Sequence, residues 1–402
     1  MSRRPTSADP ESLSPLREYL DRSGFSNLYR FVVSAQNFYF TPNAINARSQ
    51  ASVAATHTYV DGDLRGRRLL WTLMADVPVA RNELDDREAE LAEQLVADGL
   101  LSAREDRIHG GDYQLISVDN LYLFVDAGLG FPARRAAEVY FGADSTLLLY
   151  HLEGLRPGQL HGDGNLPRFL DLGTGSGVIG LSTAARAGRT VLVDVSEPAL
   201  RLARLNCALN DLENIVEIRA QDMRDTLAED RTWDLVTCNP PFIAVPPEFA
   251  LPGFAHGPGA DGLDLLRAVV ALLPARLGEH GNGFLVADLL GDHFQPFFLR
   301  ELDELAREWC VEVYIEQRRP AEGHAESMAR GIVQAAGRAT GRASGKHLSV
   351  EETTDRLRAF VLHELSAEQI YLTIIRIRRG IPGLVVYNRW RAVSAATPPR
   401  GA

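Results

Sequence analysis

Two short runs in this chain carry residue types that could do chemistry. The first, Asp171-Leu-Gly-Thr-Gly-Ser-Gly177, lies between the apolar lead-in Arg168–Leu170 and the apolar run Val178–Ala184. This order predicts a strand, a glycine turn and a helix. Glycine at alternate positions suits a turn that takes positive φ or lets a ligand approach the backbone closely. The helix that follows would point free N–H groups at whatever lies over the turn.

The second run is Asn239-Pro-Pro-Phe242, which follows the apolar segment Trp233–Cys238, a predicted strand. Another predicted strand, Thr190–Asp194, ends on an acid that could accept hydrogen bonds from ribose hydroxyls. In an open α/β sheet, ligands bind beyond the carboxyl ends of the strands. We therefore expect both strand ends to face the same ligand.

The glycine turn alone allows a second interpretation. Gly175-Ser-Gly177-Val-Ile-Gly180 is a literal G-x-G-x-x-G, the pattern of nicotinamide dinucleotide sites. Asp171 argues against such a site, because an approaching pyrophosphate would meet its negative charge. Asp194 does not decide, since both ligand classes contain a ribose, whereas Asn239–Phe242 favours the other class.

Taken in this order and spacing, Asp171–Gly177, Asp194, Asp222 and Asn239–Phe242 resemble the class I S-adenosylmethionine-dependent methyltransferases. The branch that the chain resembles contains glutamine-N5 methyltransferases of release factors and N6-adenine and N2-guanine methyltransferases. Gly257–Leu263 is also similar to the Gly-Gly-x-Asp-Gly-Leu run of the glutamine branch, with Pro258 and Ala260 as departures. The resemblance spans residues 165–318.

The resemblance implies S-adenosylmethionine as cofactor and assigns residues to it. Its methionine end would lie across the glycine turn, Asp194 would accept from the ribose hydroxyls, and Asp222 would face the adenine amine. Helix capping is the alternative role for Asp222. The full set of cofactor residues implied is Asp171, Gly173, Thr174, Gly175, Gly177, Asp194, Asp222 and Asn239.

Asn239, Pro240 and Phe242 are the expected catalytic residues. The Asn239 side-chain oxygen and the Pro240 carbonyl could accept hydrogen bonds from a planar amide or amine, and Phe242 could stack on it. Orienting that nitrogen toward the methyl group would supply much of the rate. The alternative is a proline-stiffened loop that only closes the pocket.

The predicted fold is α/β, a Rossmann-like, seven-stranded methyltransferase sheet over residues 165–402, because strands alternate with helices from Phe169 onward. The segment Gln369–Ile377 is expected to be the last strand, antiparallel at the edge. An insertion at 319–366, glycine-rich in its first half, precedes this strand. It could select the substrate, as a lid or as a plain surface loop.

Residues 1–150 are predicted to form a mainly helical, winged-helix-like domain for substrate docking or dimerisation, followed by a linker over 151–167. Helices are expected at 67–74 and 85–99, and a hairpin at 100–118 with its turn at 109–112. Ser145 and Thr146 could cap a helix or line the cofactor pocket. Winged helices often bind DNA, but acids in and near the second helix would repel phosphate. These acids are Glu83, Asp85, Asp86, Glu88, Glu90 and Glu93.

Composition limits the partners. The chain has 402 residues, 45% of them apolar, and a formal charge of −11. It has no run of eighteen apolar residues and no evident secretory signal, so we expect a cytoplasmic protein without a membrane partner. Three widely spaced cysteines suggest neither a disulfide framework nor a metal site. The negative charge argues against a long nucleic-acid partner.

Four functions stay open on the sequence alone. The first is N-methylation of a planar amide or amine nitrogen on a protein or nucleic acid, and the second is methylation of a small metabolite in natural-product biosynthesis. The third is a nicotinamide-dependent oxidoreductase, and the fourth a non-catalytic cofactor sensor. The charge and the two unmatched flanks favour a protein or small-molecule acceptor over nucleic acid, and a homodimer is compatible with the N-terminal domain.

Overall fold

The computed structural model describes residues 10–35, 67–127, 137–153, 168–249, 255–339 and 349–389. By its internal contacts the chain divides into two compact units. One comprises Met1–Asn239 with Ala268–Gly281, and the other Pro240–Arg267 with Asn282–Ala402. The predicted domains at 1–150 and 165–402 stay a prediction.

An eight-stranded sheet runs in the order β13-β11-β12-β10-β9-β6-β7-β8. Strands β6 to β9 pair in parallel, whereas β12 is antiparallel to both β10 and β11. This is the predicted Rossmann-like sheet with one added strand, β13, which pairs in parallel with β11. The bounds are β6 (Phe169–Leu172), β7 (Thr190–Asp194), β8 (Val216–Ala220), β9 (Trp233–Cys238), β10 (Leu277–Gly291), β11 (Cys310–Pro320), β12 (Gln369–Arg378) and β13 (Gly383–Asn388).

The position predicted for the last long strand was wrong. Strand β12 lies between β10 and β11 and not at the edge. Seven of its ten residues are buried, on both faces of the strand, as expected of a strand inside a sheet covered on both sides. The edge position belongs to β13, whose residues are all half-buried or exposed.

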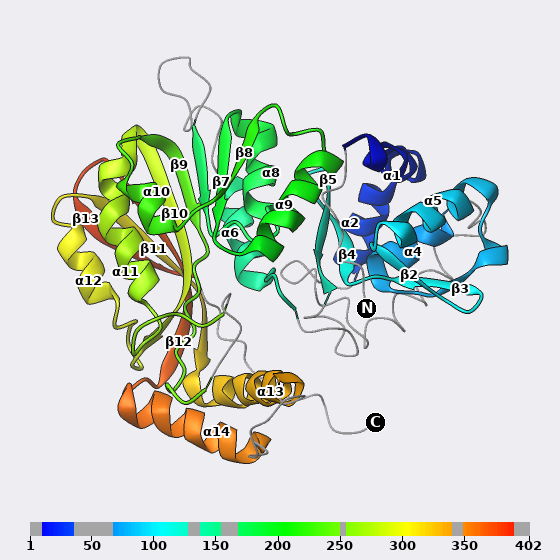
Figure 1. Ribbon diagram of the computed structural model, residues 1–402. Coiled ribbons are helices and arrows are strands. Elements are labelled where there is room, and N and C mark those ends of the chain that lie inside the picture. Colours follow the sequence, from blue (N-terminus) through cyan, green and yellow to red (C-terminus); the bar gives the residue numbers. More distant parts are fainter. Residues whose placement is uncertain are drawn as a thin grey trace, which may run out of the picture. The chain divides into compact units, whose positions relative to one another are not determined.

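Helices follow the parallel strands of the first unit, as Figure 1 shows. They are α8 (Val178–Ala187), α9 (Glu197–Leu209) and α10 (Met223–Ala228), with α6 (Ala143–Glu153) before β6. Strand β6 is buried throughout, and α9 contributes a buried stripe that includes Leu200 and Ala203. Alternation of buried strands with one-sided helices makes the core of this unit.

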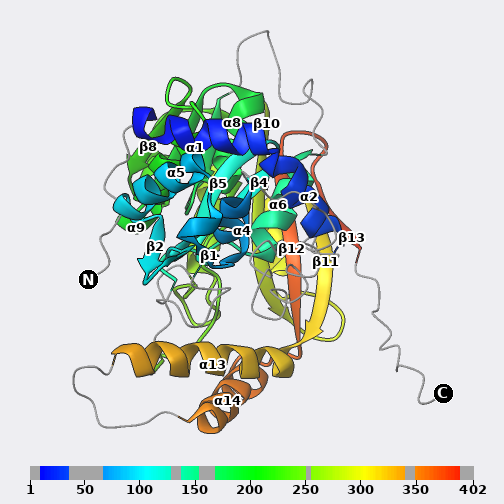
Figure 2. The same ribbon diagram turned by 90° about the vertical axis from the view of Figure 1, so that its right-hand side faces the viewer.

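In the second unit, the predicted insertion is largely helical. Helix α13 (Ala321–Ala339) and α14 (Val350–Ala359), with a π-helical turn η5 (Phe360–Glu364), connect β11 to β12, and Figures 1 and 2 show α13 and α14 side by side. Ala325, Met328, Ala329 and Ile332 of α13 form a buried cluster with Val245 and Leu357. The glycine-rich first half of the insertion is therefore helical as far as Ala339, and its remainder, 340–348, lies outside the described residues. The same unit contains α12 (Leu299–Leu305) and the first turn of α11 (Asp264–Leu272), whereas the rest of α11 and η4 (Leu273–Arg276) belong to the first unit.

The N-terminal residues form helices and two hairpins, where one hairpin was predicted. The helices α4 and α5 fall close to the expected ranges. The chain then turns at Glu105–Asp106 and again at Asp119–Asn120, so the turn predicted at 109–112 includes the end of β3, and only 111–112 separate two hairpins. Glu105, Asp119 and Asn120 adopt positive φ, which Asp and Asn tolerate better than most residues. The winged-helix assignment stays a prediction. The elements are α1 (Pro10–Ser23), α2 (Phe25–Ala35), α4 (Arg68–Ala75), β1 (Val79–Ala80), η2 (Arg81–Glu83), α5 (Asp86–Ala97), β2 (Leu101–Arg104), β3 (Arg107–Gly110), β4 (Tyr113–Val118) and β5 (Leu121–Asp126).

One of the acids on the second predicted helix does not face solvent. Glu88 is fully buried and accepts hydrogen bonds from the Tyr19 hydroxyl at 2.7 Å and the Leu69 amide at 3.1 Å. The other five acids are exposed. Glu88 therefore holds α1, α4 and α5 together, and the surface acidity comes from its neighbours.

The described part of the chain includes no helix with both the length and the apolar character needed to cross a membrane. Cys207, Cys238 and Cys310 are buried free thiols.

Candidate active site

The glycine turn has the backbone that the sequence predicts. Gly173, Gly175 and Gly177 have φ of 67°, 58° and 80°, a region that residues with a Cβ rarely adopt. The Gly173 Cα faces the end of β9, where an added Cβ would lie 3.8 Å from the Asn239 carbonyl oxygen. The turn and Asn239 thus lie together at the carboxyl ends of β6 and β9.

Asp171 lies beneath this turn and holds it. Its side chain is 1% exposed, and it accepts hydrogen bonds from the hydroxyls of Thr174 and Thr237, both at 2.6 Å, and from the Gly180 amide at 3.1 Å. Burial raises the pKa of Asp171 to about 6, although these hydrogen bonds act in the opposite direction. The carboxylate thereby joins the turn to α8 and β9, and its direct contact with a cofactor stays a prediction.

Asp194 is the last residue of β7, and Asp222 lies two residues after the end of the neighbouring strand β8. Asp194 accepts from the Gly175 amide at 2.9 Å and from the Ser196 amide at 2.8 Å, and burial raises its pKa. Asp222 caps α10 through the Arg224 amide at 2.8 Å, and its hydrogen bond with the Arg224 guanidinium lowers its pKa. The capping role is therefore present for Asp222, and its contact with an adenine stays a prediction.

The hydrogen bonds of the turn discriminate between ligand classes. A pyrophosphate on a G-x-G-x-x-G turn needs free backbone N–H groups. Here the amides of four residues in and after the turn donate within the protein, two of them to the carboxylates of Asp171 and Asp194. These residues are Thr174, Gly175, Gly177 and Gly180. Acidic groups and open glycines suit a cationic sulfonium with ribose hydroxyls better than a dianion, so the residues present fit S-adenosylmethionine.

Asn239 is held by two residues at the start of α6. Its side-chain nitrogen donates to Asp144 Oδ2 at 3.1 Å and to Ser145 Oγ at 3.0 Å. Because α6 begins at Ala143, Ser145 lies inside the first turn and is not the helix cap. Asp144 was not among the predicted site residues, although an acid beside Ser145 at the start of an apolar segment was an available signal in the sequence.

The segment after Asn239 belongs to the second unit and is shaped by a glycine-containing loop. The Ile243 amide donates to the Ala255 carbonyl at 3.1 Å, and the Gly257 amide donates to the Ile243 carbonyl at 3.2 Å. A Cβ at Gly257 would lie 1.9 Å from the Gly262 carbonyl oxygen, and a Cβ at Gly262 would lie 2.7 Å from the Phe242 carbonyl oxygen. The loop therefore packs backbone against backbone on Phe242 and Ile243.

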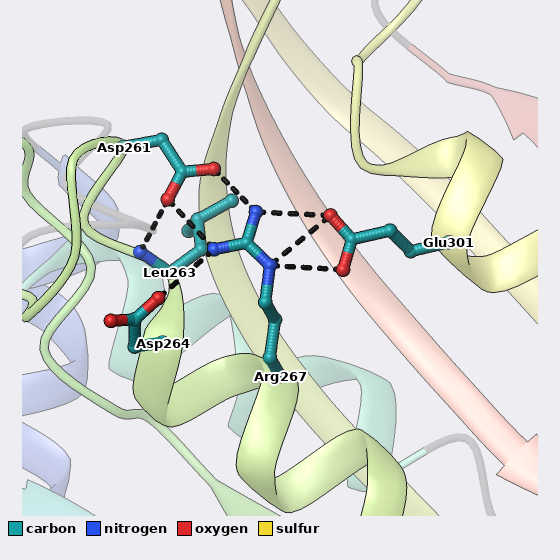
Figure 3. Close-up of polar contacts among 5 residues, drawn as sticks. All are labelled: Asp261, Leu263, Asp264, Arg267 and Glu301. Carbon is teal, nitrogen blue, oxygen red and sulfur yellow. Dashed lines mark hydrogen bonds and ion pairs between the residues drawn. The ribbon is translucent and has the colours of Figure 1, made fainter.

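Arg267 fixes this loop from the first turn of α11, as Figure 3 shows. Its guanidinium donates to both carboxylate oxygens of Asp261, at 2.9 Å and 2.5 Å, and to Asp264 at 3.2 Å. The Glu301 carboxylate of α12 accepts from the same guanidinium at 2.9 Å. Asp261 also accepts from the Leu263 amide, and hydrogen bonding to Arg267 lowers the Asp261 pKa against the effect of burial. Arg267 thus anchors the predicted Gly257–Leu263 run to two helices.

Comparison with known proteins agrees with these features. Residues 143–247 match the family model described as methyltransferase small domain. A ribosomal protein uL3 glutamine methyltransferase of Bordetella pertussis is 32% identical over 155 residues, which are 36% of this chain and 51% of that protein. A release factor glutamine methyltransferase of Cereibacter sphaeroides is 37% identical over 123 residues, 28% of this chain and 44% of that protein. The chain thus spans about half the length of these curated relatives.

Among solved structures, a SAM-dependent methyltransferase from Agrobacterium tumefaciens aligns with 53% of this chain and 66% of its own, at a TM-score of 0.36 and 18% identity. The fold assignment rests on the strand order of the sheet. The glycine turn, the carboxylates at the strand ends and the strand order of the sheet agree with the match of residues 143–247 to the methyltransferase small domain family.

Proposed function

We propose that this chain is an S-adenosylmethionine-dependent methyltransferase that methylates a side-chain amide nitrogen of glutamine in a protein. The observation that carries the proposal is Asn239-Pro-Pro-Phe242, which follows β9 with its asparagine beside the glycine turn. By their names, the relatives reported above are glutamine methyltransferases of a ribosomal protein and of release factors.

The residues of the chain bind and orient the two substrates. Bound S-adenosylmethionine would supply the methyl group. Asn239 Oδ1 and the Pro240 carbonyl would accept the two N–H hydrogens of the glutamine amide, which fixes the nitrogen in one orientation. An amide nitrogen is a poor nucleophile because its lone pair is delocalised, so holding it toward the methyl group is the main contribution that the protein can make.

The exposed acids around α5 and the formal charge of −11 support a protein acceptor over a nucleic acid. If the methyl acceptor is instead a small metabolite, the transferred label will be found in a small molecule and not in a protein. The labelling experiment below distinguishes the two acceptors. A homodimer and a cytoplasmic location stay predictions.

The full chain is tested first by thermal shift with S-adenosylhomocysteine and with NAD. We expect stabilisation by S-adenosylhomocysteine only, and stabilisation by NAD alone would overturn the proposal. The chain is then incubated with tritium-labelled S-adenosylmethionine and purified uL3 or release factor from the same organism. Label retained on the protein acceptor supports the proposal. Label found only in a small-molecule filtrate, after incubation with cell extract, would instead favour a metabolite acceptor.

A further inference from the structure

The orientation of the Asn239 amide is determined by its neighbours. An ionised carboxylate can only accept hydrogen bonds, so the Asn239 atom that faces Asp144 Oδ2 at 3.1 Å must be the nitrogen. The Ser145 hydroxyl oxygen, at 3.0 Å, accepts from the same nitrogen. Asn239 Oδ1 is consequently directed to the opposite side of the amide group, away from these two residues.

Asp144 is itself held in place. Its side chain is buried, and its second oxygen, Oδ1, accepts from the Tyr140 hydroxyl at 2.7 Å. Gly142, between these two residues, makes room for the contact, since a Cβ there would lie 2.0 Å from the Tyr140 hydroxyl oxygen. The three side chains form a chain of hydrogen bonds, from Tyr140 through Asp144 to Asn239.

We propose that Asp144, fixed by Tyr140, is a positioning residue that locks the Asn239 amide with Oδ1 presented as an acceptor to the N–H of the methyl acceptor. This inference rests on the proposed function, because it explains how the asparagine acquires the polarity that amide methylation needs. The Asn239 amide could otherwise turn by half a rotation and present N–H groups to another N–H.

An isosteric substitution changes which side-chain atoms donate and which accept hydrogen bonds, but it keeps the shape of the side chain. In Asp144→Asn the new amide can keep the hydrogen bond from Tyr140 through its oxygen and point its own NH₂ at Asn239. Asn239 would then turn its oxygen toward position 144 and its nitrogen toward the methyl acceptor. We expect kcat to fall on the order of 100-fold, the loss typical of a misoriented reacting pair. Binding of S-adenosylhomocysteine, measured by calorimetry, should not change.

Two further variants make the comparison specific. Tyr140→Phe removes only the hydroxyl that holds Asp144, and we expect a smaller loss of kcat with unchanged cofactor affinity. Asp234→Asn is the matched control, because Asp234 lies at the opposite end of β9, where it accepts from the Arg168 amide at 2.7 Å. This control should keep the transfer rate of the unaltered protein. Transfer is measured with tritium-labelled S-adenosylmethionine on uL3 and on a release factor.

A second readout does not need activity. In protein labelled with ¹⁵N at asparagine, the side-chain NH₂ of Asn239 should exchange slowly with solvent, because both hydrogens are bound by Asp144 and Ser145. Exchange should accelerate in Asp144→Asn and in Tyr140→Phe, but not in Asp234→Asn. If the unaltered chain neither binds S-adenosylhomocysteine nor transfers methyl groups, the proposed function fails, and the exchange rates still decide whether Asp144 orients Asn239.

Full activity in Asp144→Asn, or an Asn239 exchange rate equal to that of the unaltered protein in both test variants, would overturn the inference. If Asp144→Asn does not fold, Tyr140→Phe decides by the same two measurements.

Discussion

Asn239 and Asp171 illustrate two fates of a polar side chain at a strand end. Both carboxylate oxygens of Asp171 accept hydrogen bonds from protein donors beneath the glycine turn. Asn239 uses its nitrogen on protein acceptors, which directs its oxygen elsewhere. A buried polar atom needs a hydrogen-bond partner. Both oxygens of Asp171 have partners within the protein, which makes Asp171 a structural residue, whereas the oxygen of Asn239 is the atom proposed to bind the substrate. Asn239 is therefore the residue at which substitution should separate catalysis from folding.

Replacing Asn239 with alanine should remove the acceptor for the substrate amide and leave the glycine turn intact. We expect methyl transfer to fall by at least about 100-fold, as for loss of a preorganised polar contact in other enzymes. Affinity for S-adenosylhomocysteine, measured by calorimetry, should change little. An Asn239→Ala protein with the transfer rate of the original chain would show that the acceptor site lies elsewhere.

Asp171 should make the free energy of unfolding decrease as pH rises. Its pKa is raised from 3.8 to about 6, so between these values the folded state binds more protons than the unfolded state. The contribution of Asp171 to the free energy of unfolding therefore falls as pH rises from about 4 to about 6, by about 3 kcal/mol for a shift of this size. Asp171→Asn lacks this term.

Urea unfolding of both proteins at pH 4 and pH 7 provides the check. The stability of Asp171→Asn relative to the original chain should improve between the two pH values, because the other titrating groups are shared and cancel. A stability difference that is the same at both pH values would contradict the raised pKa.

At the scale of elements, two asparagines one helical turn apart join α9 to the second N-terminal hairpin: Asn206 lies in α9 and Asn210 directly after its end. Asn206 accepts from the Phe124 amide at 2.7 Å and donates to the Phe124 carbonyl at 2.8 Å, and Asn210 repeats both contacts with Tyr122 at 2.9 Å and 2.7 Å. These amides serve β5 as a neighbouring strand would. Asn206 also donates to the Ser176 carbonyl in the glycine turn at 2.8 Å.

Asn206→Ala should therefore weaken both the fold and the cofactor site. It leaves three buried backbone groups without their partner, and each such group costs about 1–3 kcal/mol. We expect a clear loss of stability in urea and weaker binding of S-adenosylhomocysteine. Asn210→Ala is the control, because Asn210 is half-buried and has no contact with the turn. It should destabilise the protein less and leave the affinity unchanged. Equal affinity for S-adenosylhomocysteine in the two variants would show that Asn206 does not support the cofactor site.

The loop that packs on Phe242 gives a second prediction at this scale. Gly262→Ala would place a Cβ 2.7 Å from the Phe242 carbonyl oxygen at a φ of 77°, so the backbone after Asn239 must move. We expect a loss of about 1–3 kcal/mol in stability and reduced methyl transfer. Gly323→Ala in α13 meets nothing within 4 Å and should be neutral or stabilising. Similar unfolding curves for the two variants would contradict the predicted clash.

Elements with regular apolar patterns were predictable from the sequence, whereas a glycine-containing helix and an exposed edge strand were not. Strands β6, β7 and β9 were predicted within one or two residues because buried parallel strands are largely apolar runs. Helix α13 was missed because its glycines suggested a loop. Its buried residues at 325, 328, 329 and 332 nevertheless have helical spacing. Strand β13 is exposed at the sheet edge, and it therefore shows no burial pattern in the sequence.

At the scale of the whole molecule, the sequence predicted which residues meet at the strand ends but not how they are bonded. The positive φ of the glycines follows from residue type, whereas the contact of Asn239 with Asp144 joins residues 95 positions apart. Such a contact depends on how α6 packs, which no local pattern contains. Likewise, the sequence predicted Glu88 as one of several acids that would repel phosphate, whereas in the fold its carboxylate is buried and hydrogen-bonded to Tyr19.

The charge of the whole chain leads to a prediction about partners. A protein with a formal charge of −11 repels a polyphosphate overall, and displacement of counterions by cationic side chains supplies most of the affinity of non-specific nucleic-acid binding. The exposed acids of α5 would add repulsion at the N-terminal helices. Duplex DNA or transfer RNA, added in excess, should therefore not inhibit methylation of uL3 or a release factor. Fluorescence polarisation with labelled duplex DNA should detect no binding at 150 mM salt, where non-specific binders typically show dissociation constants of about 10⁻⁴ to 10⁻⁶ M. Binding tighter than this range, with inhibition of protein methylation by the same nucleic acid, would instead identify a nucleic-acid acceptor.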